Sequence, residues 1–241
     1  MYRTILFIPP YLHPMTFADQ VIAFTRGLRP PDIALPTGFE WLFPYEQPET
    51  LEALTVFYQK YYADAQPRAF LFGINPGRFG AGVTGVPFTD PVRLETECGI
   101  RNPFPKKQEL SAQFVWQFIG AFGGATAFCR QFYITSLSPL GFVKNGININ
   151  YYDDRQLLRT VEPFLVWNIR TQLDFGAHRE AAICLGEGQN FKVFQKLNAQ
   201  HGFFREVIPL PHPRWVMQYR RKMVEAYVET YVQTLHGVLM H

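Results

Sequence analysis

"FLFGINPGRFGAGVTGVPF", residues 70–88, carries the chain from a short apolar run into a turn crowded with glycine and proline. The run "RAFLFGI" (68–74) has the composition of a buried strand, and the glycines begin where it ends. Asn75 stands before Pro76, and a residue before proline is held away from the helical region, so the backbone directs the Asn75 side chain. An ordinary turn needs far fewer constraints. The stretch therefore predicts a strand with a functional loop at its carboxyl end.

Apolar runs and helical patterns alternate on either side of this stretch. Helical periodicity is present at 16–29, 49–63, 113–124, 153–176 and 220–240, and further short apolar runs lie at 131–140, 180–188 and 204–213. Such alternation is typical of a parallel sheet covered by helices. We expect an α/β fold, a three-layer α/β/α sandwich with a central, mostly parallel sheet of about four strands. No repeat or linker interrupts residues 1–241, so a single domain is expected.

Polar side chains follow three of these predicted strands. Asn75, Ser136 and His212 each stand where an apolar run ends. Ligands of such folds bind beyond the carboxyl ends of the strands, so we expect the three residues to face one cleft. Plainer readings stay open locally: Asn75 as the cap of its own turn, and His212 as the cap of a loop.

Two common uses of a glycine-rich loop are excluded here. No Gly-Lys-Ser/Thr follows at the spacing of a P-loop, and the Gly-x-Gly-x-x-Gly order of a dinucleotide site is absent at the strand end. The loop therefore serves another ligand.

The composition limits the class of protein. Cys98, Cys129 and Cys184 are far apart and odd in number, which favours reduced thiols in a cytoplasmic protein and excludes a four-cysteine iron–sulfur cluster within the chain. No long apolar run predicts a membrane span, and "MYRTILFIPPYLHPM" (1–15) is too broken by proline for a signal peptide. The net charge of +3 permits a polyanionic partner without requiring one.

The opening stretch also resembles a known family. "GINPG" (73–77), "FG" (79–80) and "TGVPF" (84–88) are similar to the first motif of the uracil-DNA glycosylase superfamily. The "TGVPF" extension at this spacing resembles the SMUG-type branch, the single-strand-selective monofunctional enzymes. The second motif of that family opens with His-Pro near the C-terminus, and "PHP" (211–213) matches it. The chain looks most like a divergent bacterial-type subgroup of this branch.

The resemblance implies a base-excision repair enzyme that hydrolyses the N-glycosidic bond of uracil, or another deaminated base, flipped out of DNA. It implies that Asn75 holds the attacking water and that His212 donates a hydrogen bond to O2 of the base, where negative charge develops. Phe88 would stack on the base, and Ile74 and Phe79 would complete the pocket floor. No lysine lies in the motifs to form a Schiff base, so a monofunctional enzyme is expected, a monomer without metal or cofactor.

A basic segment follows the second motif, and no acidic residue interrupts 212–222. Its residues expected to contact DNA are Arg214, Trp215, Arg220, Arg221 and Lys222. Cations interleaved with aromatic side chains suit a protein that holds phosphates while it extrudes a base. The plainer reading is an ordinary solvated helix start.

The middle motif departs from the family's pattern. The family has an Asn in an Asn-Leu-Cys-Pro-Leu run, whereas this chain has "SLSPL" (136–140), which places Ser136 on the Asn position. A hydroxyl lacks the fixed donor–acceptor pair of a carboxamide, so Ser136 predicts a wider base range. Asn145 or Asn148 just downstream are alternative base readers. Arg78 also replaces a proline usual in the family.

Two other functions compete with the glycosylase. One is a non-catalytic binder of damaged or single-stranded DNA on the same fold, and the other is a hydrolase of small nucleosides. The basic segment favours DNA over free nucleosides.

Overall fold

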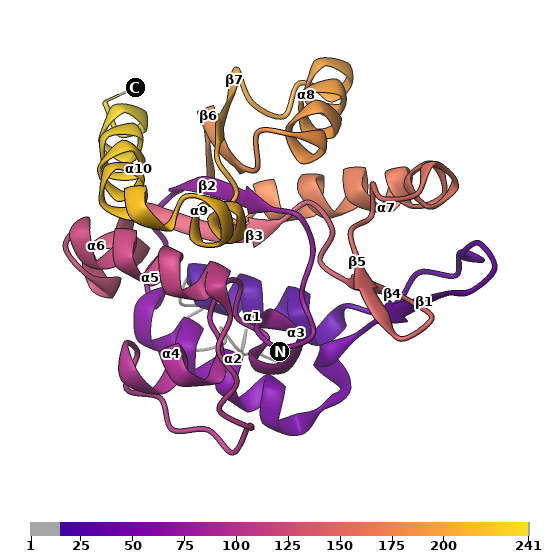
Figure 1. The fold of residues 1–241 in the computed structure, drawn as a ribbon, viewed down its shortest axis with the longest axis horizontal. Coiled ribbons are helices and arrows are strands. Elements are labelled where there is room, and N and C mark those ends of the chain that lie inside the picture. Colours follow the sequence, from indigo (N-terminus) through magenta and orange to yellow (C-terminus); the bar gives the residue numbers. More distant parts are fainter. Residues whose placement is uncertain (1–14, 241) are drawn as a thin grey trace, which may run out of the picture.

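Four parallel strands form the centre of the computed structural model, which describes residues 15–240 (Figure 1). The sheet has the order β3-β2-β6-β7, with β2 (Arg68–Gly73) and β6 (Ala177–Leu185) inside and β3 (Phe132–Ser136) and β7 (Glu206–Leu210) at the edges. All three strand pairs are parallel. Every residue of β2 is buried, as its apolar run predicts.

Helices surround this sheet (Figure 1). They are α1 (Phe17–Gly27), α2 (Pro48–Tyr61), α3 (Ala81–Thr84), α4 (Pro91–Thr96), α5 (Leu110–Ala121), α6 (Ala125–Gln131), α7 (Arg155–Leu173), α8 (Gln189–His201), α9 (Pro213–Tyr219) and α10 (Val224–Val238), with 3-10 turns η1 (Pro44–Glu46) and η2 (Arg221–Met223). The predicted α/β class with a central four-stranded parallel sheet is confirmed.

Local sequence explains where the long helices begin. The Thr16 side chain accepts from the Asp19 N–H while Asp19 bonds back to Thr16, which closes a capping box on α1. Asp154 caps α7 by accepting from the first backbone N–H groups of that helix. Pro163 lies inside α7 without ending it, so the helical period predicted for 153–176 persists.

The segment after His212 differs from the prediction. We expected a loop, but Pro213 begins helix α9 and His212 is its N-cap residue. Proline at the first helical position has the required φ and loses no hydrogen bond there, which explains the helix. The predicted helix at 220–240 accordingly starts as the turn η2, and regular α-helix begins at Val224.

A second, antiparallel sheet was not predicted. It has the order β1-β4-β5, from β1 (Phe39–Leu42), β4 (Gly141–Lys144) and β5 (Ile147–Ile149). Asn145 and Gly146 form the turn between β4 and β5, both with positive φ (52° and 76°). Asn-Gly is a strong hairpin signal, so this hairpin was readable from the sequence. It carries residues 148–152 toward the carboxyl ends of the parallel strands.

One large hydrophobic core joins the parallel sheet to its helices. Cys98, Cys129 and Cys184 are free and buried. Within residues 15–240 no helix is long and apolar enough to cross a bilayer. The expectation about a signal peptide concerns residues 1–15 and lies almost wholly outside the described residues.

Candidate active site

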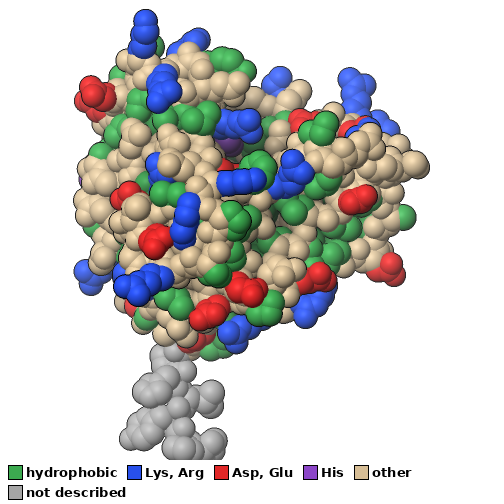
Figure 2. All heavy atoms as spheres, turned by 60° about the horizontal axis from the view of Figure 1, so that its bottom comes forward, with side chains coloured by type: hydrophobic (Ala, Val, Ile, Leu, Met, Phe, Trp, Pro, Cys, Tyr) green, Lys and Arg blue, Asp and Glu red, His purple; other side chains and the backbone are tan. Residues whose placement is uncertain are grey.

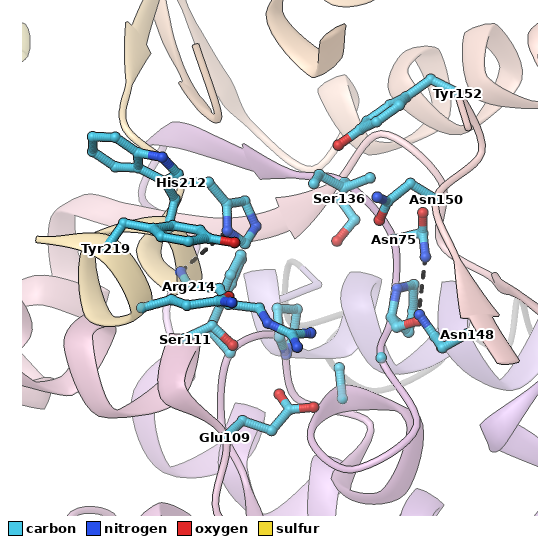
Figure 3. A pocket seen from close by; sticks show the side chains of 18 residues that line it. Asn75, Glu109, Ser111, Ser136, Asn148, Asn150, Tyr152, His212, Arg214 and Tyr219 are labelled. Atoms are coloured by element: carbon cyan, nitrogen blue, oxygen red, sulfur yellow. Dashed lines mark hydrogen bonds between the residues drawn. The ribbon is translucent and has the colours of Figure 1, made fainter. Parts of the chain in front are cut away.

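A pocket of about 330 Å³ opens beyond the carboxyl ends of β2, β3 and β7 (Figure 3). Asn75, Ser136 and His212 all line it, one from the end of each strand. The structure thus brings the three strand-end residues to one cleft, as the parallel topology predicted.

Phe88 forms a wall of this pocket. Its backbone has a φ of 51°, a left-handed conformation that is rare for an aromatic residue. The ring lies directly over Gly73, where a Cβ atom would come within 2.8 Å of the Phe88 ring. The ring centroids of Phe88 and His212 are 6.0 Å apart. Gly73 is therefore required for the close approach that places the Phe88 ring in the pocket.

The Asn75 carboxamide is held by a distant segment of backbone. Its Nδ2 donates to the Ile149 carbonyl (3.3 Å), and its Oδ1 accepts from the Tyr151 N–H (3.2 Å). These partners determine which end of the amide is oxygen, since a carbonyl only accepts and an N–H only donates. The contact of Nδ2 with the adjacent Pro76 carbonyl is longer, 3.4 Å, so Asn75 is more than the cap of its own turn.

His212 presents a neutral ring to the pocket. Its Nδ1 accepts a hydrogen bond from the Arg214 backbone N–H (3.1 Å), which leaves the ring hydrogen on Nε2. Burial lowers the pKa of His212 to about 4, and the Arg214 charge acts in the same direction. Above that pH His212 is a neutral hydrogen-bond donor.

Glu109 is the one carboxylate among the described residues that line the pocket, and the sequence reasoning missed it. A Cβ on Gly80 would lie 2.1 Å from its Oε2, so the glycine makes room for this side chain. Burial raises the pKa of Glu109 and nearby Asp90 adds to the rise, while the backbone N–H groups of Gly80 and Phe79 oppose it. Glu109 follows an irregular segment, and no local signal marks it.

Three further polar residues reach the pocket from the hairpin. Asn148, Asn150 and Tyr152 line it, while Tyr151 between them is fully buried. Strand geometry turns alternate residues to one face, and the alternation in "NINI" after an Asn-Gly turn was the signal that could have found them. Asn145, named beside Asn148 as a possible base reader, is exposed in the turn and does not line the pocket.

A family model of the uracil DNA glycosylase superfamily matches residues 59–236. The chain belongs to the uracil-DNA glycosylase superfamily. A solved structure described as "The crystal structure of WT Pedobacter heparinus SMUG2" has a TM-score of 0.92 and 43% sequence identity with it, covering 94% of this chain and 100% of that one. A search of curated proteins found no match.

The family and the structural likeness confirm the predicted SMUG-type membership. The protein is a DNA glycosylase of base-excision repair that acts on uracil, and DNA is its partner. The alternative of a non-catalytic DNA binder is not favoured.

One residue predicted for the glycosylase pocket lies outside it. The Phe79 side chain does not line the pocket: it is 43% exposed, and its ring packs near Arg78 and Lys107, whose cationic groups are 5.5 and 4.7 Å from its centroid. The Glu109 carboxylate occupies the space beside the 77–80 loop, so the ring is directed to the surface. Ile74, predicted together with Phe79, does line the pocket.

The predicted DNA-contacting residues lie at and beside the pocket. Arg214 and Trp215 line the pocket, and the Arg220 guanidinium lies 4.8 Å from the Trp215 ring centroid. Arg221 and Lys222 are exposed on η2. Figure 2 shows Lys and Arg side chains grouped around a hollow on one face, in which part of a His side chain is visible. None of the ion pairs found in residues 15–240 involves these cations.

Arg220→Ala combined with Arg221→Ala is expected to weaken binding of all DNA sequences alike. Each lost phosphate contact should lower the slope of log affinity against log salt by about one, because fewer counterions are released. Fluorescence anisotropy with single-stranded oligonucleotides across a salt series measures this. Arg205→Ala, which removes a surface arginine paired with Glu180, is the matched control. An unchanged slope would show that the two arginines face away from DNA.

In the part of the chain that the structure describes, no group of His, Cys, Asp or Glu side chains is arranged to hold a metal ion. The polar side chains that line the pocket offer amide, imidazole, hydroxyl, guanidinium and carboxylate groups.

Proposed function

We propose that this glycosylase is monofunctional and that water is its nucleophile. The observation that carries the proposal is the placement of the Asn75 amide and the neutral His212 ring in one pocket, with the Phe88 ring as its wall. A flipped base stacks on Phe88, Asn75 holds the water, and His212 donates to O2 of the base. Ser136 and Ile74 contact the base from the strand ends.

The charge on His212 suits this task. Bond cleavage pushes electrons onto the base, and a donor placed in advance at O2 stabilises them. A neutral ring can do this without first losing a proton, because its pKa of about 4 lies below physiological pH. One such donor contributes about 3 kcal/mol to the transition state. Asn75 has no basicity to offer, so its contribution is orientation of the water.

The monofunctional assignment rests on the pocket's composition. An enzyme that also cuts the strand uses an amine to form a Schiff base with the sugar. No lysine is among the described residues that line this pocket. We further propose that residues 1–241 act as one domain and as a monomer, in a reducing cytoplasm that suits three free buried cysteines.

Excision from a single-stranded oligonucleotide with one uracil tests the function. Free uracil should appear, and the strand should break only after alkali treatment. Borohydride added during the reaction should trap no covalent complex. Strand cleavage without alkali, or a trapped complex, would contradict the monofunctional assignment, and binding without uracil release would contradict the catalytic roles.

Ser136 is expected to widen the base range. Its hydroxyl faces the pocket, and a hydroxyl rotates to donate or accept, so it penalises a wrong base edge less than a carboxamide does (Figure 3). The wild type should therefore remove hypoxanthine or xanthine as well as uracil. Ser136→Asn should narrow the range toward uracil.

Matched oligonucleotides containing uracil, hypoxanthine and xanthine measure the rate ratios. Ser136→Ala is the control that removes the hydroxyl without adding an amide. If the wild type removes uracil alone, or if Ser136→Asn leaves the ratios unchanged, Ser136 does not read the base.

A further inference from the structure

The hairpin that follows the middle motif places asparagines around the Asn75 side chain. Figure 3 shows Asn148 and Asn150 on either side of the Asn75 amide. Ile149, which lies between them, supplies the carbonyl that accepts from Asn75 Nδ2. Asn148 is thus one residue away from a direct partner of Asn75, although the two asparagines are far apart in sequence.

Asn148 has an unusual polar atom. Its Oδ1 is buried and accepts no hydrogen bond from any residue of the 15–240 segment. Leaving a buried acceptor unpaired costs about 1–3 kcal/mol, so such atoms are normally satisfied by protein, water or ligand. The side chain lines the pocket, and the missing donor must therefore come from the pocket itself.

The chemistry of the substrate limits what that donor is. A phosphodiester has no hydrogen to donate, which excludes the DNA backbone. An N–H of the base or a water molecule remains. The imide edge of uracil lies on the side of the ring away from the sugar, whereas Asn148 lies beside the amide that holds the nucleophile in the proposed function. The position of Asn148 therefore favours water.

Asn75 alone leaves the water incompletely oriented. One lone pair of Asn75 Oδ1 is used by the Tyr151 N–H, so this oxygen has one acceptor position left. A water molecule donates two hydrogens. A second acceptor beside the first directs both hydrogens away from the sugar and leaves an oxygen lone pair free for C1′.

We propose that Asn148 is a second catalytic residue, whose Oδ1 holds the nucleophilic water together with Asn75; this rests on the proposed function. The water oxygen forms the bond to C1′ as the C1′–N bond breaks, and the bonding electron pair leaves with the base. The proton that the water loses ends on the released base, so the products are an abasic sugar and free uracil. Neither amide is protonated.

Single-turnover excision of uracil from a single-stranded oligonucleotide tests this. Asn148→Ala should slow the chemical step by about a hundredfold, because the water is misplaced. Asn148→Asp, which retains an acceptor oxygen, should stay within about tenfold of the wild type. Asn75→Ala combined with Asn148→Ala should be no slower than Asn75→Ala alone, since both residues hold the same water.

Two binding measurements separate a role toward water from a role toward the base. The inhibition constant of free uracil and the affinity for an oligonucleotide with a non-hydrolysable 2′-fluorinated uridine should be unchanged in Asn148→Ala. Asn145→Ala, at the exposed turn of the same hairpin, is the control, and melting curves check that each variant folds.

Two outcomes would overturn the proposal. Full activity of Asn148→Ala beside a slow Asn75→Ala would remove the second acceptor and leave the proposed function standing. Weaker inhibition by free uracil would make Asn148 a base reader. Full activity of Asn75→Ala would instead refute the proposed function itself.

Discussion

Asn75→Ala is expected to slow uracil excision by about a thousandfold while affinity for DNA stays near the wild-type value. The side chain faces the pocket and has no place among the surface cations, so its loss removes the orientation of the water and no phosphate contact. Single-turnover rates with saturating enzyme measure the chemical step, and fluorescence anisotropy measures the affinity.

The same substitution leaves the Ile149 carbonyl and the Tyr151 N–H without their side-chain partners. Two unpaired backbone groups should lower the free energy of unfolding by about 1–3 kcal/mol, so rates must be compared well below the melting temperature. Asn75→Asp is the matched variant: it still accepts from Tyr151 but places a carboxylate against the Ile149 carbonyl. Near-normal turnover in Asn75→Ala would end the assignment of the water to this residue.

His212→Ala is expected to lower the chemical step by about two to three orders of magnitude, the effect of removing one donor at a developing anion. The pH dependence is the sharper measurement. The pKa of His212 is lowered to about 4, so the ring stays neutral and the wild-type rate should show no inflection near pH 6.5 from this residue. His212→Gln, which retains an N–H donor, should recover part of the rate.

The same pKa shift affects stability with a definite sign. Between pH 6.5 and 4 the unfolded chain binds a proton at His212 that the folded protein does not. The contribution of His212 to the free energy of unfolding is therefore complete above pH 6.5 and falls as the pH drops toward 4. An inflection of the excision rate near pH 6.5 that disappears in His212→Gln would contradict the neutral donor.

Several features of the fold and the site were readable from the sequence because they depend on neighbouring residues. The apolar run of β2 ends at Gly73, and a buried strand of this kind belongs in a parallel sheet. Since parallel strands end at the same edge, the polar residues after them had to meet. The strand pattern alone therefore predicts that Asn75, Ser136 and His212 lie together, and the pocket contains all three.

The errors have local causes too. Phe79 was placed in the pocket from its position in a motif, but the direction of its ring depends on Glu109, which comes from another part of the chain. The helix α9 was missed because the basic segment after the second motif was read as a loop. Proline is nevertheless favoured at the first position of a helix, and Pro213 stands there.

By itself, the sequence determined the strands, the long helices and which polar residues stand at the strand ends, since hydrophobic period and proline or glycine act over a few residues. Only the tertiary structure decided how those side chains are held. The Asn75 amide is oriented by backbone groups more than seventy residues away, and the tautomer of His212 follows from the helix that it caps. The buried oxygen of Asn148 likewise acquires its meaning from the hairpin that sets it beside Asn75. Contacts of this kind depend on distances between segments, and no local pattern encodes them.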